Sequence, residues 1–208
     1  MTDKHSLPAV AFLRTIGGHN LKNCGTIAGL MTTTPKVMCL IGSMTPNGNG
    51  ARMMEIAMSA VEAAGGQANL WDIHAKRLPF FGENWTDENV AEFKKQALET
   101  DAFLLCTPEY HGTISGLLKN QIDWLSSDQF SDKPVALMST LGGQSNSNAL
   151  NHMRLSLRHV HAIVIREQVM MPHTKQAWNE DGTLADEGLQ GRIEKMATKL
   201  IETVHLLR

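Results

Sequence analysis

The sequence predicts an α/β fold in which a five-stranded parallel sheet is covered by helices on both faces. Two observations support this prediction. Short apolar runs alternate along the chain with longer segments whose apolar residues recur at helical spacing. The chain has 208 residues, of which 42% are hydrophobic and 19% charged. A chain of this length and composition can bury one hydrophobic core. Because strands that alternate with helices pair in parallel, the sheet is expected between two helical layers.

The first half of the domain is predicted as strand, helix, strand, helix. The strand over 37–41 is a short apolar run, as expected of a buried parallel strand. The helix over 53–64 has apolar residues at helical spacing and stops at Gly65-Gly66. A weaker strand over 68–73 is followed by an irregular loop and a helix over 86–98. This order places one crossover helix between the first two strands.

The second half repeats the strand and helix pattern three times. Its strands are short apolar runs, and its last helix carries a long apolar face. The predicted elements are strands over 102–106, 134–138 and 163–165 with Val169, and helices over 117–125, 148–159 and 187–207. Five such strands most often order as 2-1-3-4-5, with ligands outside the carboxyl ends of strands 1, 3 and 4. The loops over 43–50, 107–115 and 140–147 are therefore the candidate binding loops.

Composition excludes several function classes. Nineteen basic and 21 acidic residues give a net charge of −2, so a nucleic-acid partner is not expected. No apolar run reaches the roughly 20 residues of a membrane helix, so no membrane partner is expected either. The three cysteines and nine histidines show no metal-ligand spacing, and we expect no metal site. An odd number of cysteines in a chain of this length indicates a reducing, cytoplasmic compartment.

Residues 1–34 differ from the rest of the chain. They show no sustained helical or strand period, and Met31 stands shortly before the first predicted strand. We expect an N-terminal extension that is disordered or results from a mis-called start, with the folded domain over 35–208. A targeting segment and a working extension are the alternatives, although the stretch lacks the Arg and Ser content of a transit peptide.

The first candidate loop, Gly42-Ser-Met-Thr-Pro-Asn-Gly-Asn-Gly50, joins a strand to a helix start, where free backbone N–H groups favour an anion. Its spacing fits neither a nucleotide-hydrolase loop nor the dinucleotide fingerprint. Hydroxyl and amide side chains add donors without adding charge. A phosphate held by neutral donors is typical of a flavin mononucleotide site, and a merely connecting glycine-rich turn is the alternative.

The second candidate loop carries the longest motif. It reads Thr107-Pro-Glu-Tyr-His-Gly-Thr-Ile-Ser-Gly-Leu-Leu-Lys-Asn-Gln-Ile-Asp-Trp124 and contains Tyr110, the one tyrosine of the chain. This motif resembles the signature of the NADPH-dependent FMN reductase family of quinone, azo-dye and chromate reductases, usually T-P-E-Y-N-G-S-x-P-G-x-L-K-N-x-I-D-W. The resemblance extends over residues 36–206 and includes Gly42-Ser43, Gly142-Gly143 and the late segment Trp178-Asn-Glu-Asp-Gly182.

The resemblance implies a flavodoxin-like three-layer sandwich that binds FMN and takes electrons from NADPH or NADH. Catalysis is centred on the flavin, with Tyr110 and His111 as the nearest candidate catalytic residues. The implied cofactor contacts are Ser43, Thr45, Asn49 and Gly50 for the phosphate, Pro108, Glu109, Tyr110, His111 and Gly112 at the ring edge, and Gly142, Gly143 and Gln144 at the pyrimidine side.

The chain departs from the family pattern in two places. Thr45 stands where many members have Arg, so the phosphate depends on neutral donors or on Arg52 reaching back. His111 replaces the motif's Asn, which matters only if that position acts through its side chain. The family also implies that the helix over Lys119–Trp124 lies at a subunit contact of a homodimer or homotetramer. A solvated Lys119–Asp123 surface pair is the alternative.

The implied reaction is hydride transfer from NAD(P)H to flavin N5 and onward to a quinone, azo compound, chromate or free flavin. Because donor and acceptor would use one ring face in turn, ping-pong kinetics are expected. A flavodoxin-like FMN electron carrier without direct NAD(P)H oxidation is the main alternative, and a flavin-binding regulatory protein is a third. A hydrolase built on Ser43 is disfavoured because the Gly-x-Ser-x-Gly elbow is missing.

Overall fold

A computed structural model describes residues 33–144 and 147–208, and most of the predicted extension over 1–34 lies outside these residues. Strands and helices alternate as the apolar patterns predict. The elements are β1 (Lys36–Ile41), α1 (Asn49–Ala63), β2 (Gln67–Leu70), α2 (Glu88–Glu99), β3 (Ala102–Tyr110), β4 (Thr113–Ile114), α3 (Gly116–Asp123), α4 (Ser127–Phe130), β5 (Pro134–Thr140), α5 (Asn148–His159), β6 (Ile163–Met171) and α6 (Glu187–Leu207).

The sheet has the strand order β2-β1-β3-β5-β6, and all of these neighbours pair in parallel. Counting only the five long strands, this is the predicted order 2-1-3-4-5, so the predicted topology is confirmed. The short β4 lies off this path and pairs antiparallel with the end of β3. The order reverses direction between β1 and β3, which places a switch point at their carboxyl ends.

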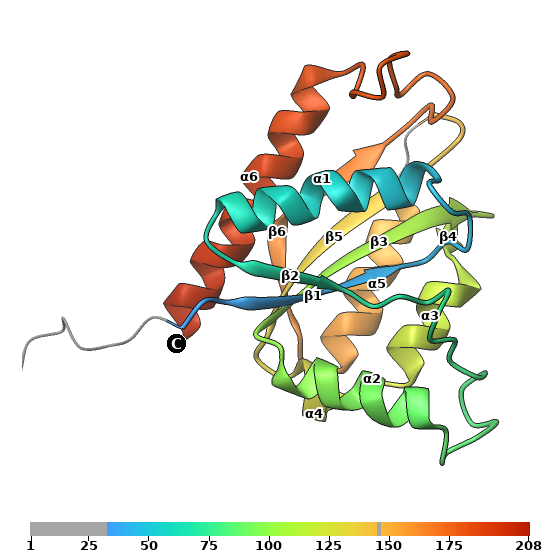
Figure 1. Cartoon of the computed structure of the whole chain (residues 1–208), viewed down its shortest axis with the longest axis vertical. Helices are drawn as coiled ribbons and strands as arrows, with labels where there is room; N and C mark the ends of the chain where they lie inside the picture. The colour runs from blue at the N-terminus through green and yellow to red at the C-terminus, as the bar shows by residue number, and fades with distance from the viewer. Residues whose placement is uncertain (1–32, 145–146) are drawn as a thin grey trace, which may run out of the picture. The chain divides into compact units, whose positions relative to one another are not determined.

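Helices cover both faces of the sheet, which confirms the three-layer sandwich (Figure 1). On one face α1 and α6 pack over β1, β3, β5 and β6, with Met53 and Val61 of α1 against the apolar side of α6. On the other face α2, α3, α4 and α5 bury a second cluster that includes Phe93, Leu118 and Leu157. Along each central strand, successive side chains enter the two clusters in turn, as expected of strands buried on both faces.

Several element boundaries differ from the predictions for local reasons. The second strand ends at Leu70 rather than residue 73, because Asp72 Oδ1 accepts hydrogen bonds from the N–H groups of His74 and Ala75 and turns the chain. The helix predicted over 117–125 begins one residue earlier, at Gly116, and ends at Asp123, and the Ser115 side chain caps its start. The helices over 148–159 and 187–207 have the predicted bounds.

Two short elements were not predicted. The α4 turn begins with a capping box in which Ser126 and Gln129 satisfy each other's backbone N–H groups. The β4 strand exists because β3 continues past the predicted Cys106 as far as Tyr110 and turns back on itself.

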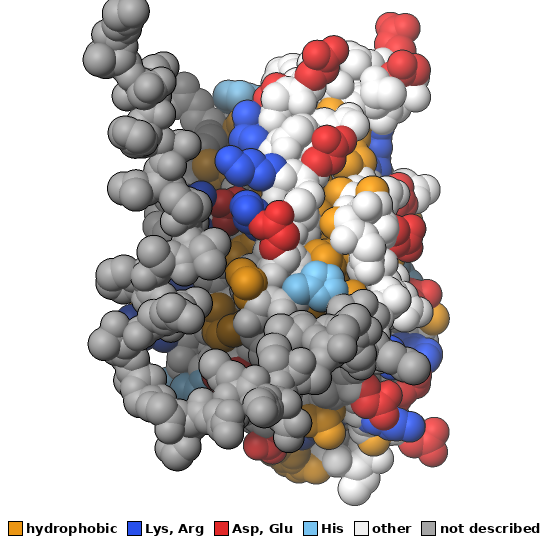
Figure 2. All heavy atoms as spheres, turned by 90° about the vertical axis from the view of Figure 1, so that its left-hand side faces the viewer, with side chains coloured by type: hydrophobic (Ala, Val, Ile, Leu, Met, Phe, Trp, Pro, Cys, Tyr) orange, Lys and Arg blue, Asp and Glu red, His pale blue; other side chains and the backbone are white. Residues whose placement is uncertain are grey.

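Figure 2 shows the side of the molecule that lies on the left of Figure 1, where α6 and the end of α1 lie. Acidic and basic side chains are interspersed over its described residues. This face therefore carries no extended patch of one sign of charge among those residues, unlike a surface that tracks a nucleic-acid backbone.

Candidate functional site

The three loops singled out by the sequence begin side by side at the carboxyl edge of the sheet. Ile41 at the end of β1 pairs with Cys106 of β3, and Pro108 of β3 pairs with Thr140 at the end of β5. The first, second and third loops therefore leave neighbouring strands at nearly the same level. The fold thus brings the predicted binding segments together, although every element from α1 to β5 separates the first loop from the third in sequence.

The first loop starts with a close backbone approach. Gly42 N–H donates to Cys106 O at 2.8 Å, and a Cβ atom at Gly42 would lie 2.5 Å from Ser115 Oγ and 3.0 Å from Thr107 Oγ1. Glycine is therefore required here, because a side chain would collide with the residue that caps α3. Beyond it, Ser43 Oγ accepts from Thr45 N at 3.2 Å, which leaves its hydroxyl proton to donate outward.

The N-terminus of α1 follows this loop and offers free donors. Its N-cap residue, Gly48, has no side chain to cap the helix, and the first turn contains no acidic residue. The first backbone N–H groups of a helix have no partner within the helix, so those at Asn49, Gly50 and Ala51 point their positive ends toward the loop. Neutral donors of this kind fit a phosphate group.

A late segment of the chain packs against this helix terminus. Trp178 Nε1 donates to Asn49 Oδ1 at 2.7 Å. The Arg52 guanidinium lies 3.6 Å from the centre of the Trp178 ring and donates to Gly182 O at 3.0 Å. Arg52 was a candidate to reach back to the phosphate, but in this structure its contacts are with Trp178 and Gly182. Sequence reasoning noted the 178–182 segment and did not foresee its position.

The second loop is a tight hairpin between β3 and β4. Tyr110 pairs with Thr113, and the two residues between them, His111 and Gly112, have φ angles of 51° and 75°. Two successive left-handed residues are what a two-residue hairpin of type I′ requires. His111 thus occupies a backbone conformation that Asn adopts more readily, which explains why Asn is the usual residue of the motif.

Side chains of this hairpin point in different directions. Tyr110 is 54% exposed, so its ring is available to a ligand at the sheet edge. Glu109 is buried, and its Oε2 accepts from the N–H of Ala149 in the first turn of α5 at 3.0 Å. The carboxylate therefore stabilises the start of α5. Thr113 Oγ1 and His152 Nδ1 lie 2.7 Å apart and join β4 to α5.

The third loop is open at its two glycines. Gly142 and Gly143 have no heavy atom of the described residues within 4 Å of a would-be Cβ, and neither has a positive φ. Gly143 O accepts from His173 N at 3.0 Å, so the loop is tied to the segment after β6. Neither packing nor backbone conformation within the described chain explains these glycines, whereas a flat group lying against the loop would. Gln144 follows them and is exposed.

The helix after the hairpin holds the loop between β2 and α2. Asn120 donates to Pro79 O at 2.9 Å and accepts from Phe81 N at 2.8 Å, and Trp124 Nε1 also donates to Pro79 O at 2.8 Å. The rings of Phe81, Trp85 and Trp124 meet edge to face, with centroids 5.2 to 5.3 Å apart. Asn120 and Trp124 belong to the motif, so the sequence singled out both positions. The motif did not predict that their side chains bind the loop at Pro79 and Phe81.

Lys119 and Asp123, on the outer side of the same helix, pair with each other. Lys119 Nζ donates to Asp123 Oδ1 within the chain, and both side chains are partly exposed. Within one chain the two residues therefore form the solvated surface pair that was the alternative to a subunit contact. Both side chains remain accessible to a second subunit.

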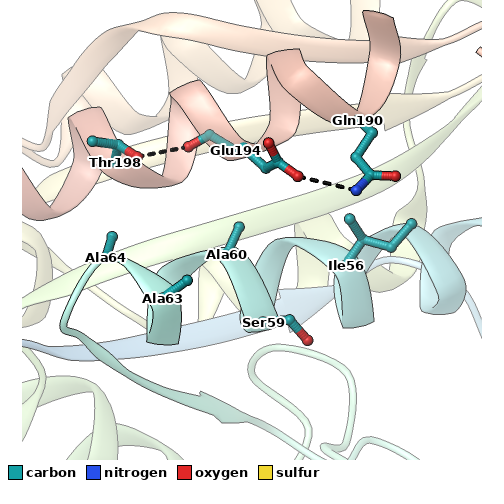
Figure 3. A pocket seen from close by; sticks show the side chains of 8 residues that line it. All are labelled: Ile56, Ser59, Ala60, Ala63, Ala64, Gln190, Glu194 and Thr198. Carbon is teal, nitrogen blue, oxygen red and sulfur yellow. Dashed lines mark hydrogen bonds between the residues drawn. The ribbon is translucent and has the colours of Figure 1, made fainter. Parts of the chain in front are cut away.

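A groove of about 470 Å³ lies between α1 and α6, away from the three loops (Figure 3). Its wall on α1 consists mainly of small side chains, and Figure 3 shows Gln190, Glu194 and Thr198 opposite them on α6. Gln190 donates to Glu194 Oε1 and Thr198 donates to Glu194 O, so these polar side chains are already paired within α6. The described residues that line the groove supply no convergent polar groups for chemistry.

The described residues contain no reactive thiol, no metal site and no membrane-spanning helix. Burial raises the pKa of Cys39 and of Cys106 to about 12, so neither thiol is a nucleophile near neutral pH. Across residues 33–144 and 147–208 no group of His, Cys, Asp and Glu side chains is arranged to hold a metal ion. No helix in the same residues is long and apolar enough to span a membrane.

Comparison with known proteins connects this geometry to one family. The family described as NADPH-dependent FMN reductase matches residues 35–176. An FMN-dependent NADPH-azoreductase of Staphylococcus aureus is 30% identical over 179 residues, which cover 82% of this chain and 95% of that protein. An NADPH azoreductase of Bacillus sp. (strain OY1-2) is 42% identical over 109 residues, half of this chain and 61% of that relative's length.

Solved structures show the same fold. FerB, a flavoenzyme NAD(P)H:(acceptor) oxidoreductase from Paracoccus denitrificans, aligns with a TM-score of 0.71 at 22% identity over 83% of this chain and 98% of that one. An archaeal flavodoxin aligns with a TM-score of 0.58 at 12% identity over 82% and 99% of the two chains. The chain therefore belongs to the NADPH-dependent FMN reductase family, flavodoxin-like oxidoreductases that use FMN as cofactor and NADPH as electron donor.

Proposed function

We propose that this protein transfers electrons from NAD(P)H to quinone, azo, chromate or free-flavin acceptors at the carboxyl edge of its sheet. The observation that carries the proposal is the meeting of three loops of neutral donors with the uncapped start of α1. Bound FMN would supply the redox chemistry, since its ring accepts a hydride and releases electrons to a second substrate. The protein's part is to hold, orient and shield that group.

The first loop would hold the phosphate. Ser43 and Thr45 offer hydroxyls, Asn49 offers its amide, and Gly50 offers a backbone N–H at the positive end of α1. With no basic side chain in the loop itself, the phosphate charge would be balanced by these dipoles rather than by an ion pair. Such a site selects a phosphate by geometry and stays near neutral overall.

The second and third loops would border the flat ring. Backbone donors from Pro108 to Gly112, except at the proline, would meet one edge, and the exposed Tyr110 ring would lie nearest to the reacting face together with His111. Gly142, Gly143 and Gln144 would approach the other edge, where the missing side chains leave room. Fixed N–H groups at a ring edge favour its electron-rich, reduced form because they stabilise added negative charge.

The loop over 78–85 supports aromatic acceptors. Phe80, Phe81 and Trp85 are 78%, 51% and 63% exposed, and Asn120 holds the loop in place by two hydrogen bonds. Planar substrates such as quinones and azo compounds stack well on such rings. The names of the azoreductase relatives agree with this acceptor class.

Anaerobic rapid mixing with NADPH tests the proposal. The FMN-loaded protein should lose its yellow absorbance within seconds without any added reductase, and NADH measured alongside gives the donor preference. Absorbance that persists would leave the flavodoxin-like electron carrier, the second candidate that the archaeal flavodoxin match supports at the level of fold. A single-turnover panel of quinone, azo dye, chromate and free FMN then ranks the acceptors, and parallel double-reciprocal plots would indicate ping-pong kinetics.

We also propose that the enzyme is a homodimer or homotetramer that uses the Lys119–Trp124 helix as a contact. The partly exposed Lys119 and Asp123 are available to exchange partners across a two-fold axis. Sizing at micromolar concentration tests this, and a monomer at all concentrations would overturn it. Lys119→Ala should weaken the assembly and leave a folded chain.

The domain assignment and the location are proposed on simpler grounds. Thr34–Arg208 forms one unit by its contacts, so a chain of residues 35–208 should bind FMN as the full chain does. The buried free thiols of Cys39 and Cys106 and the use of NADPH both suit the reducing cytoplasm. Side-by-side FMN titrations and cell fractionation check these two points.

A further inference from the structure

The segment over 177–185 contacts the first residue of α1 through a hydrogen bond from Trp178 Nε1 to Asn49 Oδ1. We propose that Trp178 is a positioning residue: its indole N–H fixes the orientation of the Asn49 amide so that Nδ2 donates into the anion site of the first loop. The proposal rests on the proposed function, because it takes that loop as the binding site of the FMN phosphate.

The chemistry of the two groups sets the orientation. An indole N–H is a donor only, so it must meet the oxygen of the Asn49 amide. The amide nitrogen is then left on the other arm, and within the described residues it donates to no protein acceptor. A flipped amide would place two donors against each other and would turn an oxygen toward the phosphate. One hydrogen bond therefore decides whether Asn49 attracts or repels an anion.

Trp178 is itself held firmly enough to impose this choice. The Arg52 guanidinium stacks on the indole at 3.6 Å and donates to Gly182 O at 3.0 Å. Trp178 also pairs with Leu184 across the turn, and Ala185 N donates to Ala177 O at 3.0 Å. The ring is thus fixed by a small hairpin on one side and by a cation on the other.

This arrangement gives the one cation in the first turns of α1 an indirect role. Arg52 contacts neither Ser43 nor Thr45 among the hydrogen bonds of the described chain, and its two contacts both hold the 178–182 segment. In place of an arginine at position 45, the correctly oriented Asn49 amide donates an N–H to the phosphate without adding charge. Arg52 and Trp178 act through Asn49 rather than on the ligand.

The test compares FMN with riboflavin, which lacks the phosphate. Flavin-free full-length protein is titrated with each flavin, and the quenching of flavin fluorescence gives both dissociation constants. Trp178→Phe keeps the ring for Arg52 but removes the N–H, so the FMN constant should rise about tenfold while the riboflavin constant changes less than about twofold. Gln190→Ala is the control, because it removes a side-chain N–H donor on α6, away from the three loops, and it should change neither constant.

Asn49→Ala should raise the FMN constant by a similar factor, and adding Trp178→Phe to it should cause no further loss. Asn49→Asp keeps an acceptor for Trp178 but turns a negative oxygen toward the phosphate. It should weaken FMN more than Asn49→Ala does and leave riboflavin unchanged, which keeps the proposal testable if Trp178→Phe fails to fold.

Equal losses for FMN and riboflavin in Trp178→Phe would overturn the positioning role, as would independent effects of Trp178→Phe and Asn49→Ala. Those outcomes leave the proposed function intact, since FMN still binds. A wild-type chain that binds no flavin would instead remove the proposed function and this inference with it.

Discussion

Gly42 provides the sharpest test of how the first loop is built. Alanine at this position would put a Cβ atom 2.5 Å from Ser115 Oγ and 3.0 Å from both Leu118 Cβ and Thr107 Oγ1. Ser115 cannot simply turn away, because its Oγ accepts from Leu118 N at 3.1 Å and caps α3. The added methyl group must therefore both overpack this site and displace the Ser115 cap.

The size of the effect follows from these two costs. Overpacking a tight site costs about 1–3 kcal/mol, and losing a serine N-cap costs about 1 kcal/mol. Gly42→Ala should therefore lower the free energy of unfolding by about 2–4 kcal/mol. For a domain of this size that corresponds to a fall in Tm of about 4–16 °C.

Thermal and urea unfolding, followed by circular dichroism at one fixed FMN saturation, measure this change. Gly116→Ala is the matched control, because a Cβ there meets nothing within 4 Å among the described residues, and its Tm should stay the same or rise slightly. In a Ser115→Ala background the closest contact is gone, so Gly42→Ala should cost at least about 1 kcal/mol less than in the wild type. A Gly42→Ala protein with wild-type Tm, or equal costs in both backgrounds, would refute this account of the loop.

Three further predictions concern the hairpin, α5 and the buried thiols. His111→Asn should raise the free energy of unfolding by up to about 1 kcal/mol, because Asn adopts the left-handed conformation more readily; urea denaturation measures it, and a loss of stability would contradict the turn assignment. Glu109→Gln should lower stability by about 1–2 kcal/mol, since the charge at the start of α5 is lost, and an unchanged urea midpoint would show that this charge is not needed. Burial raises the pKa of Cys106 from 9.0 to about 12, so above pH 9 the unfolded chain releases this proton first and stability falls as pH rises toward 12. Cys106→Ala should reduce that fall, and iodoacetamide at pH 8 should label Cys39 and Cys106 only after unfolding; labelling of the native protein would show that the thiols are not buried.

The sequence predicts best the elements whose apolar residues recur at a regular local spacing. α5 and α6 have the predicted bounds because their apolar residues recur at helical spacing and the segments before them break that spacing. The order of the five long strands is the one that five strands alternating with helices most often adopt. The four-residue α4, with its capping box at Ser126 and Gln129, was not predicted.

Other features could not be predicted because no local pattern encodes them. The two residues of β4 are too few to show a period, and its turn is formed with His111, a residue without a strong turn signal. The buried direction of Glu109 depends on α5, 40 residues away. The contact between Trp178 and Asn49 depends on the tertiary fold entirely. Motif resemblance names the residues of the candidate site, whereas the structure shows which side chain each one meets.

The distance in sequence between Asn49 and Trp178 has a consequence for synthesis of the protein. The two residues lie 129 positions apart, and the later one follows the last strand of the sheet. On the ribosome, where chains emerge from the N-terminus at a limited rate, the first loop leaves the exit tunnel long before its tryptophan partner is made. All six strands of the described residues have been translated before Trp178 can reach Asn49. The hydrogen bond that orients the Asn49 amide can therefore form only late in synthesis.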